Sequence, residues 1–378
     1  MKVPNSPREF SQVLASFTNY ERLPTFRYDT ESFDLRRMEA LAASLGNPHD
    51  RYPAVHIAGT KGKGCTCLML EALLRAEGLK VGTYTSPHIE HLRERIRIGG
   101  KSISEESFMR TVNSILPLIE PADGESGSPT FFELLTAMAM LCFARSSVDI
   151  SIFEVGLGGR LDATNILSAR WSAITSLGLE HTQLLGNTLT AIAREKAGIV
   201  RPQTPLITGE LPEEARKEVE RIATEKGAPW TVADPGSVKL NCDGLLEIDG
   251  IQGVFKAPAI RGPGIRADLA ISIALYRTVL KNLDKRLDTI QLRSALENLR
   301  LPARIEVFPG PPTCCLDTAH TPESIKSLRK TLEEIDFPQP RALILSLSTD
   351  KRREEILAEA GGIADEIIFT RADETRSV

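Results

Sequence analysis

The feature that most restricts the fold of this chain is an alternation of short apolar runs with amphipathic segments over its first two-thirds. Between the first two runs, apolar residues over 69–76 follow the i, i+3, i+4, i+7 spacing of one helix face. Strands that alternate with helices predict an α/β fold of P-loop type, a mostly parallel sheet with helices on both faces. Ligands then gather at the carboxyl ends of the strands. The expected strands lie at 54–58, 81–85, 150–155, 172–176 and 205–208.

The rest of the chain predicts a second, smaller domain of Rossmann-like α/β type. Residues 230–256 are typical of small antiparallel hairpins, and we interpret the region of Pro302 as a hinge. We predict domains at 1–299 and 300–378, the second abbreviated or truncated because its pattern stops early. Further expected helices are 267–281, 290–298, 322–334 and 354–360, and further expected strands are 314–316, 342–346 and 366–370.

The composition argues against several classes of protein. The chain has 378 residues, 25% charged residues and a formal net charge of −4, so it lacks the broad basic surface of a nucleic-acid binder. No apolar run approaches the ~20 residues of a membrane span, and the N-terminus has no apolar signal core. The six cysteines show no zinc-site or disulfide-framework spacing. We therefore predict a cytoplasmic protein that binds neither nucleic acid nor membrane.

The first candidate site is the glycine-rich sequence GTKGKG at 59–64, between a predicted strand and a predicted helix. This order directs helix N–H groups at whatever the loop holds, and Lys63 supplies a positive charge for phosphate oxygens. Gly64 stands where the P-loop pattern has Ser or Thr, so a hydroxyl for Mg²⁺ must come from elsewhere. An ordinary glycine-rich turn is the alternative, but three glycines and two lysines in six residues favour phosphate binding.

Polar residues at three further strand ends could share this edge of the sheet. Glu154 ends the third predicted strand, and its carboxylate is a suitable Mg²⁺ ligand. Ser86 follows the second strand, where a Ser-Pro turn is the ordinary alternative. His181 lies beyond the fourth strand, where a structural histidine is equally compatible with the pattern. Lys196 closes the next helix, where a lysine commonly only complements the helix dipole.

Six motifs resemble those of the folylpolyglutamate synthase/dihydrofolate synthase family, which belongs to the Mur ligase superfamily. In chain order they are GTKGKG, TSPHI…ERI, FFELLT, EVGLGGRLDATN, LGLEHTQLLGNTLTAIAREKAGIV and LDTAHTPES. The resemblance extends from about residue 20 to residue 376, and EVGLGGRLDATN and EKAGIV are far more specific than the loop alone. It implies a monomeric ATP-dependent ligase that attaches L-glutamate to folate or dihydropteroate through an acyl phosphate. The domain at 1–299 would bind ATP and folate, and that at 300–378 would be the glutamate-ligase domain.

By position, the resemblance implies three groups of site residues. The catalytic residues would be Lys63, Lys196 and His320, with Lys196 carbamylated as its counterpart in the family is. The Mg²⁺ ligands would be Ser86, Glu154 and His181, so that Ser86 supplies the hydroxyl that the loop lacks. The nucleotide-binding residues would be Gly59, Thr60, Lys61, Gly62, Lys63, Gly64, Cys65, Asp268, Arg304 and Asp317.

Several positions depart from the family pattern. Asp268 stands where the family has an Asn that meets adenine, Lys61 replaces the usual Asn, and Cys65 replaces Ser or Thr. Thr318 and Thr321 alter the usual Asp-Gly-Ala-His-Asn motif. Two alternatives therefore stay open: a Mur-type amide ligase acting on another acid, and a nucleotide-binding protein that has lost ligase activity.

Overall fold

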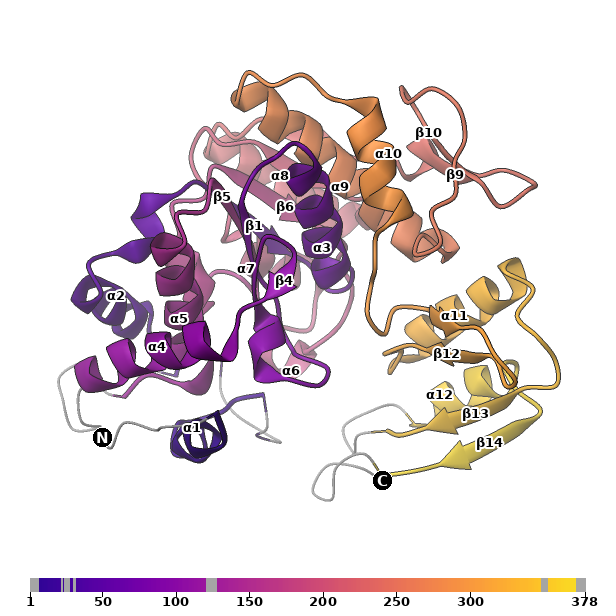
Figure 1. Cartoon of the computed structure of the whole chain (residues 1–378), viewed down its shortest axis with the longest axis horizontal. Coiled ribbons are helices and arrows are strands. Elements are labelled where there is room, and N and C mark those ends of the chain that lie inside the picture. The colour runs from indigo at the N-terminus through magenta and orange to yellow at the C-terminus, as the bar shows by residue number, and fades with distance from the viewer. Residues whose placement is uncertain are drawn as a thin grey trace. The chain divides into compact units, whose positions relative to one another are not determined.

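The computed structural model describes residues 7–21, 23, 28–29, 32–119, 128–347 and 353–371 (Figure 1). The chain divides into two compact units, one comprising 1–237 with 268–296 and the other 238–267 with 297–378. The second unit therefore includes a segment that precedes the predicted hinge. The functional domains predicted at 1–299 and 300–378 stay a prediction. None of the described helices combines the length and the apolar character needed to cross a bilayer.

The first unit is built on one eight-stranded sheet with strand order β4-β3-β2-β5-β1-β6-β7-β8. All neighbours from β2 to β8 pair in parallel, whereas β3 pairs antiparallel with both β2 and β4. Every residue of β1, β2, β5, β6 and β7 is buried, as expected for a parallel sheet covered on both faces. The predicted mostly parallel α/β sheet is confirmed. Its strands are β1 (Ala54–Ala58), β2 (Val81–Tyr84), β3 (Ile96–Ile98), β4 (Lys101–Ser102), β5 (Ile150–Glu154), β6 (Trp171–Ile174), β7 (Leu206–Thr208) and β8 (Trp230–Val232).

Two edges of this sheet differ from the sequence-based expectation. Strand β8 was expected to start a hairpin, but it pairs in parallel with β7, because α8 (Glu213–Glu225) supplies the crossover that parallel strands need. At the other edge, β3 and β4 form a hairpin that the charged sequence around them does not reveal. Its turn is made by Gly99 and Gly100, whose φ angles of 60° and 82° suit a two-residue hairpin loop.

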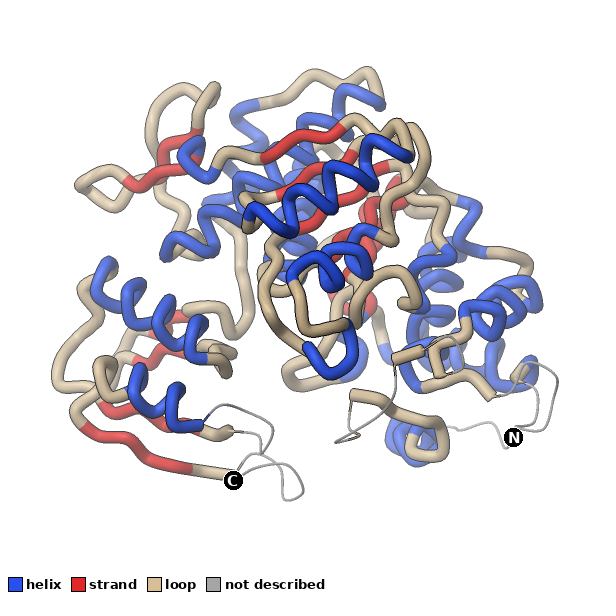
Figure 2. Tube along the Cα trace, turned by 180° about the vertical axis from the view of Figure 1, so that it is seen from behind, coloured by secondary structure: helices blue, strands red, loops and turns tan. Residues whose placement is uncertain are grey.

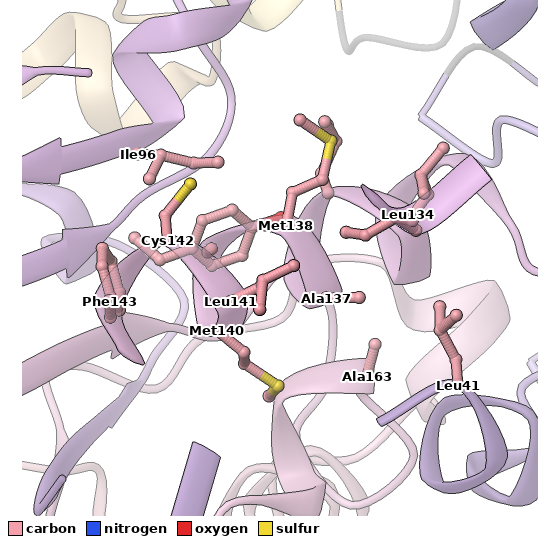
Figure 3. Packing of buried hydrophobic residues seen from close by; sticks show 14 of the residues in the cluster. Leu41, Ile96, Leu134, Ala137, Met138, Met140, Leu141, Cys142, Phe143 and Ala163 are labelled. Atoms are coloured by element: carbon pink, nitrogen blue, oxygen red, sulfur yellow. The ribbon is translucent and has the colours of Figure 1, made fainter. Parts of the chain in front are cut away.

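The helices of the first unit form two apolar clusters with the sheet. The larger joins helices α1, α2, α4 and α5 to Tyr84 of β2 and Phe153 of β5. Figure 3 shows part of it, with Met138 and Leu141 of α5 among residues from other elements. The smaller cluster joins α7 and α8 to β6 and β7. The helices are α1 (Pro7–Leu14), α2 (Leu35–Ser44), α3 (Lys63–Ala76), α4 (Glu105–Ile115), α5 (Phe131–Arg145), α6 (Thr182–Leu185), α7 (Leu189–Ala197), α8, α9 (Gly262–Asn282), which belongs to this unit from residue 268 onward, and α10 (Thr289–Glu297).

The described part of the second unit contains short sheets, two whole helices and the first residues of α9, and its strands and whole helices alternate as the second pattern predicts (Figure 2). The hairpin of β9 (Val238–Leu240) and β10 (Leu246–Ile248) confirms the turn-rich reading of that segment. Strand β12 (Cys314–Leu316) pairs antiparallel with β11 (Glu306–Phe308), which the sequence analysis did not identify. Strands β13 (Ala342–Leu345) and β14 (Glu366–Phe369) pair in parallel, and α11 (Pro322–Glu334) contacts α12 (Arg353–Ala360).

Candidate functional site

The sequence GTKGKG forms the strand–loop–helix unit that its composition predicts. Strand β1 ends at Ala58, and α3 begins at Lys63, so the helix N-terminus faces the loop. Gly62 caps the helix with a φ of 85°, which favours glycine. A Cβ placed on Gly62 would lie 2.0 Å from Oδ1 of Asp268 on α9, so the loop packs closely against this carboxylate. Cys65 is buried in the first turn of α3.

Glu154 lies beside the loop at the carboxyl end of β5. Its side chain is only 4% exposed, and its Oε2 accepts a hydrogen bond from the backbone N–H of Ser86 at 3.0 Å. A Cβ placed on Gly64 would lie 3.5 Å from the same oxygen. The end of β5, the residues after β2 and the first turn of α3 therefore meet at one point, as the parallel register of the strands requires.

A pocket opens next to this point and gathers five of the sequence-predicted residues, two of them from the loop itself. Lys63 comes from α3, His181 from the segment after β6, and Lys196 from the last turn of α7. The glycine-rich turn after β5 provides the wall between them. The pocket is lined by Gly59, Thr60 and Lys63, by residues 155–158, and by Glu180, His181 and Lys196.

Lys196 is the most perturbed cation of the pocket. Burial lowers its pKa from 10.5 to about 7, and the positive charge of Lys63 acts in the same direction. Glu180 and Asp162 partly oppose this shift. The Nζ of Lys196 donates a hydrogen bond to the backbone oxygen of Gly59 at 2.8 Å. An amine with this pKa is substantially neutral near pH 7, so it is available as a nucleophile.

The depressed pKa of Lys196 predicts a pH-dependent contribution to stability. Between a folded pKa of about 7 and an ordinary value of 10.5, the unfolded chain binds more protons than the folded one. The free energy of unfolding therefore rises with pH over this range. Lys196→Met removes this titration. We therefore expect the free energy of unfolding of the wild type minus that of the variant to grow from pH 7 to pH 10. Urea denaturation without divalent cations or bicarbonate measures it, and a constant or shrinking difference would contradict the shifted pKa.

Asp162 organises the turn that forms the pocket wall. Its carboxylate is buried and accepts hydrogen bonds from the N–H of Leu157 at 2.9 Å and from the N–H of Thr164 at 3.0 Å. The hydroxyl of Thr164 also contacts Nε2 of His56 at 2.7 Å, which connects the turn to the central strand β1. Asp162 therefore holds the backbone of this turn.

The predicted residues of the second unit form a separate group around β12. The carboxylate of Asp317 accepts hydrogen bonds from the N–H groups of Ile305 at 2.9 Å and Ala319 at 2.8 Å. Arg304 donates to the hydroxyl of Thr318, and Nδ1 of His320 contacts the backbone oxygen of Thr318 at 2.8 Å. All of these contacts are internal to the second unit, and the nucleotide-contacting roles of Arg304, Asp317 and His320 stay predictions.

Sequence reasoning missed three side chains that contact the site. The hydroxyls of Thr175 and Ser176 contact the backbone of Lys61, and a Cβ placed on Gly158 would lie 2.4 Å from the hydroxyl oxygen of Tyr28. Two consecutive hydroxyl residues directly after a central strand were a usable signal for the first pair. The position of Tyr28 depends on long-range packing that no local pattern shows.

Comparison with known proteins gives a consistent result. No protein-family model matches the chain. A dihydrofolate synthase/folylpolyglutamate synthase from Bacillus subtilis (strain 168) is 34% identical over 376 residues, which cover 96% of this chain and 87% of that protein. A Mycobacterium tuberculosis folylpolyglutamate synthase (FPGS) complexed with ADP has a TM-score of 0.85 at 29% identity, covering 98% of this chain and 83% of that one. An FPGS–AMPPCP–folate complex has a TM-score of 0.84 at 29% identity, covering 97% and 89%.

Proposed function

The chain belongs to the folylpolyglutamate synthase/dihydrofolate synthase family, and from this premise we propose that it is an ATP-dependent ligase that adds L-glutamate to folate or dihydropteroate. The observation that carries the proposal is the convergence of the glycine-rich loop, Glu154 and the pocket that contains His181 and Lys196. The loop follows β1, Glu154 ends β5 and His181 lies beyond β6, so these three come from the carboxyl ends of different strands. Lys196 joins them from the last turn of α7. These carboxyl ends are where an open parallel sheet binds its ligands.

The loop and Lys63 bind the ATP phosphates in this proposal. A carboxylate is a poor acyl donor to an amine, so the reaction first converts the carboxylate of the acid substrate to an acyl phosphate by transfer of the terminal phosphoryl group. That transfer depends mainly on positioning and on neutralising phosphate charge. Lys63 supplies a point charge for this purpose, and the first turn of α3 supplies N–H groups. The amine of glutamate then attacks the acyl carbon and displaces phosphate.

Magnesium fits the residues present. Ser86 and Glu154 offer oxygen donors next to Gly64, and His181 lies in the adjoining pocket. Among the described residues, no group of three or more His, Cys, Asp or Glu side chains could hold a metal ion by itself. Mg²⁺ normally takes only one or two carboxylates and completes its shell with water and substrate phosphates, so this arrangement suits it. When bound, the ion would neutralise phosphate charge, and we assign Ser86, Glu154 and His181 as its ligands.

We also assign Lys196 as a carbamylated residue. Its pKa of about 7 leaves a neutral amine that can attack carbon dioxide; the Nζ–C bond forms and one proton is lost to solvent. The product carries a negative charge in place of the lysine cation, which gives the pocket a further carboxylate-like group close to Lys63. Intact-mass measurement would detect the carbamate only if the carbamate survives that measurement. An increase of turnover on addition of bicarbonate is therefore the more robust observation.

The remaining assignments concern the nucleotide and the assembly. Arg304 and Asp317 contact the nucleotide, and His320 lies near its phosphates. Asp268 contacts adenine in place of the family's asparagine, and its closeness to Gly62 places it beside the loop. We propose that the protein acts as a monomer.

The test of the proposed function is incubation with ATP, Mg²⁺ and glutamate together with either dihydropteroate or tetrahydrofolate. The expected result is a product heavier by one glutamyl residue, with ADP released only when both acid and glutamate are present. A panel of other carboxylic acids separates this activity from that of a Mur-type ligase with a different acceptor. Tight ATP binding without glutamate-dependent ADP release in any mixture would instead support a nucleotide-binding protein that has lost ligase activity.

A further inference from the structure

We propose that Thr175 and Ser176 are positioning residues that set the phosphate-binding conformation of the loop at 59–64. Both follow the end of β6, a strand that the sequence analysis connected only with His181. Neither side chain is needed as a ligand; each acts through the backbone of the loop. The inference rests on the nucleotide site proposed above and adds the residues that give this site its shape.

Ser176 contacts three consecutive peptide groups of the loop. Its backbone oxygen accepts a hydrogen bond from the N–H of Thr60 at 2.8 Å. Its hydroxyl oxygen lies 3.0 Å from the N–H of Lys61 and 3.1 Å from the Lys61 backbone oxygen, so it accepts from the first and can donate to the second. A β-strand end thus binds the loop on one side by paired hydrogen bonds, as a neighbouring strand would.

Thr175 also contacts the last of these peptide groups, the one that carries the backbone oxygen of Lys61. Its hydroxyl donates to the backbone oxygen of Lys61 at 2.5 Å and lies 3.4 Å from the backbone oxygen of Ala58. A Cβ placed on Gly59 would lie 1.9 Å from this hydroxyl, so glycine is required for the approach. Thr175 is buried, and its hydroxyl is therefore fixed by its surroundings rather than by solvent.

This arrangement determines which groups can face phosphate. The N–H groups of Thr60 and Lys61 are directed at β6, which leaves phosphate oxygens to the side chain of Lys63 and to the first turn of α3. The hydroxyl of Thr60 also accepts a hydrogen bond from the N–H of Gly178 at 3.1 Å. Gly178 is three residues before His181, so the same contacts fix the start of the segment that carries a proposed metal ligand.

The first experiment measures the loop without any nucleotide. In Ser176→Ala, amide hydrogen exchange at Lys61 is expected to accelerate by about tenfold or more, because the hydroxyl that accepts from its N–H is lost. The N–H of Thr60 keeps its bond to the backbone oxygen of residue 176 and serves as an internal reference. The matched control is Ser172→Ala, the same substitution four residues earlier within β6, where the lost hydroxyl lies 3.3 Å from the backbone oxygen of Ile199. Unchanged exchange at Lys61 in Ser176→Ala would overturn the proposal.

The second experiment measures the consequence for nucleotide. We expect Ser176→Ala to raise the Kd for ADP and the KM for ATP about tenfold, with the KM for glutamate and kcat changing less than about threefold. Ser176→Thr retains the hydroxyl and should restore ATP affinity. A change that only destabilised the protein would lower the active fraction and affect all substrates alike. Equal Kd values for ADP in wild type and Ser176→Ala would overturn the positioning role.

The two experiments separate this inference from the proposed function. If wild type binds ADP more tightly than Ser176→Ala but forms no glutamylated product, the ligase assignment fails and the positioning role stands. If wild type ligates glutamate and Ser176→Ala does so with an unchanged KM for ATP, the ligase assignment stands and the positioning role fails.

Discussion

Lys63→Ala is expected to reduce glutamate-dependent turnover by about 10³-fold while the protein stays folded, in line with the loss of a single charge-stabilising group in phosphoryl transfer. Lys63 is half-buried at the first position of α3 and lines the pocket with His181 and Lys196. In the proposed mode of binding, its removal leaves the terminal phosphate of ATP without the lysine assigned to it. The measurement is steady-state ADP release in the presence of glutamate and the pterin acid, with the midpoint of thermal unfolding as the check on folding.

The control for this prediction is Lys101→Ala, which removes an exposed lysine from the edge strand β4. It should leave both turnover and thermal unfolding unchanged, because an isolated exposed charge contributes little to stability. Removal of Lys63 also removes a repulsive charge from Lys196, whose pKa should then rise toward its ordinary value. Wild-type turnover in Lys63→Ala would show that the loop does not bind the reacting phosphate.

The sequence predicted the centre of the sheet better than its edges. Buried strands such as β1 and β5 are nearly continuous apolar runs, and the glycine-rich loop between β1 and α3 is a local pattern, so both could be read directly. Edge strands such as β3 and β8 are short, and their neighbours are set by distant parts of the chain. A three-residue strand has too little periodicity to distinguish a parallel edge from a hairpin.

In the site, too, some features follow from the order of elements along the chain, and others depend on distant packing. Strand ends brought Lys63 and Glu154 to one edge because parallel strands all end there, and this follows from the order of elements alone. The contact between Asp268 and Gly62 joins positions more than two hundred residues apart, and it depends on how α9 packs. The hydrogen bonds of Ser176 likewise depend on the pairing of β6 with β1, which fixes the distance between a strand end and the loop. Side-chain contacts of this kind require the three-dimensional arrangement.

Glu154 carries the second large expected effect, and its two plausible roles predict different results. As a metal ligand, Glu154 contributes its negative charge. As a structural residue, it contributes an acceptor for the N–H of Ser86, which it binds at 3.0 Å while being 4% exposed. Glu154→Ala removes both contributions; turnover should fall by about 10²–10³-fold, and the unsatisfied N–H should cost about 1–3 kcal/mol of stability.

Glu154→Gln separates the two roles because its amide oxygen can still accept the hydrogen bond from Ser86. If the charge is what matters, Glu154→Gln regains the stability that Glu154→Ala loses but stays as inactive as Glu154→Ala, and a higher Mg²⁺ concentration should partly restore its turnover. Turnover measured against Mg²⁺ concentration, together with thermal unfolding of both variants, decides the question. Near-wild-type turnover in Glu154→Gln would remove Glu154 from the metal site and leave it the task of fixing the backbone at Ser86.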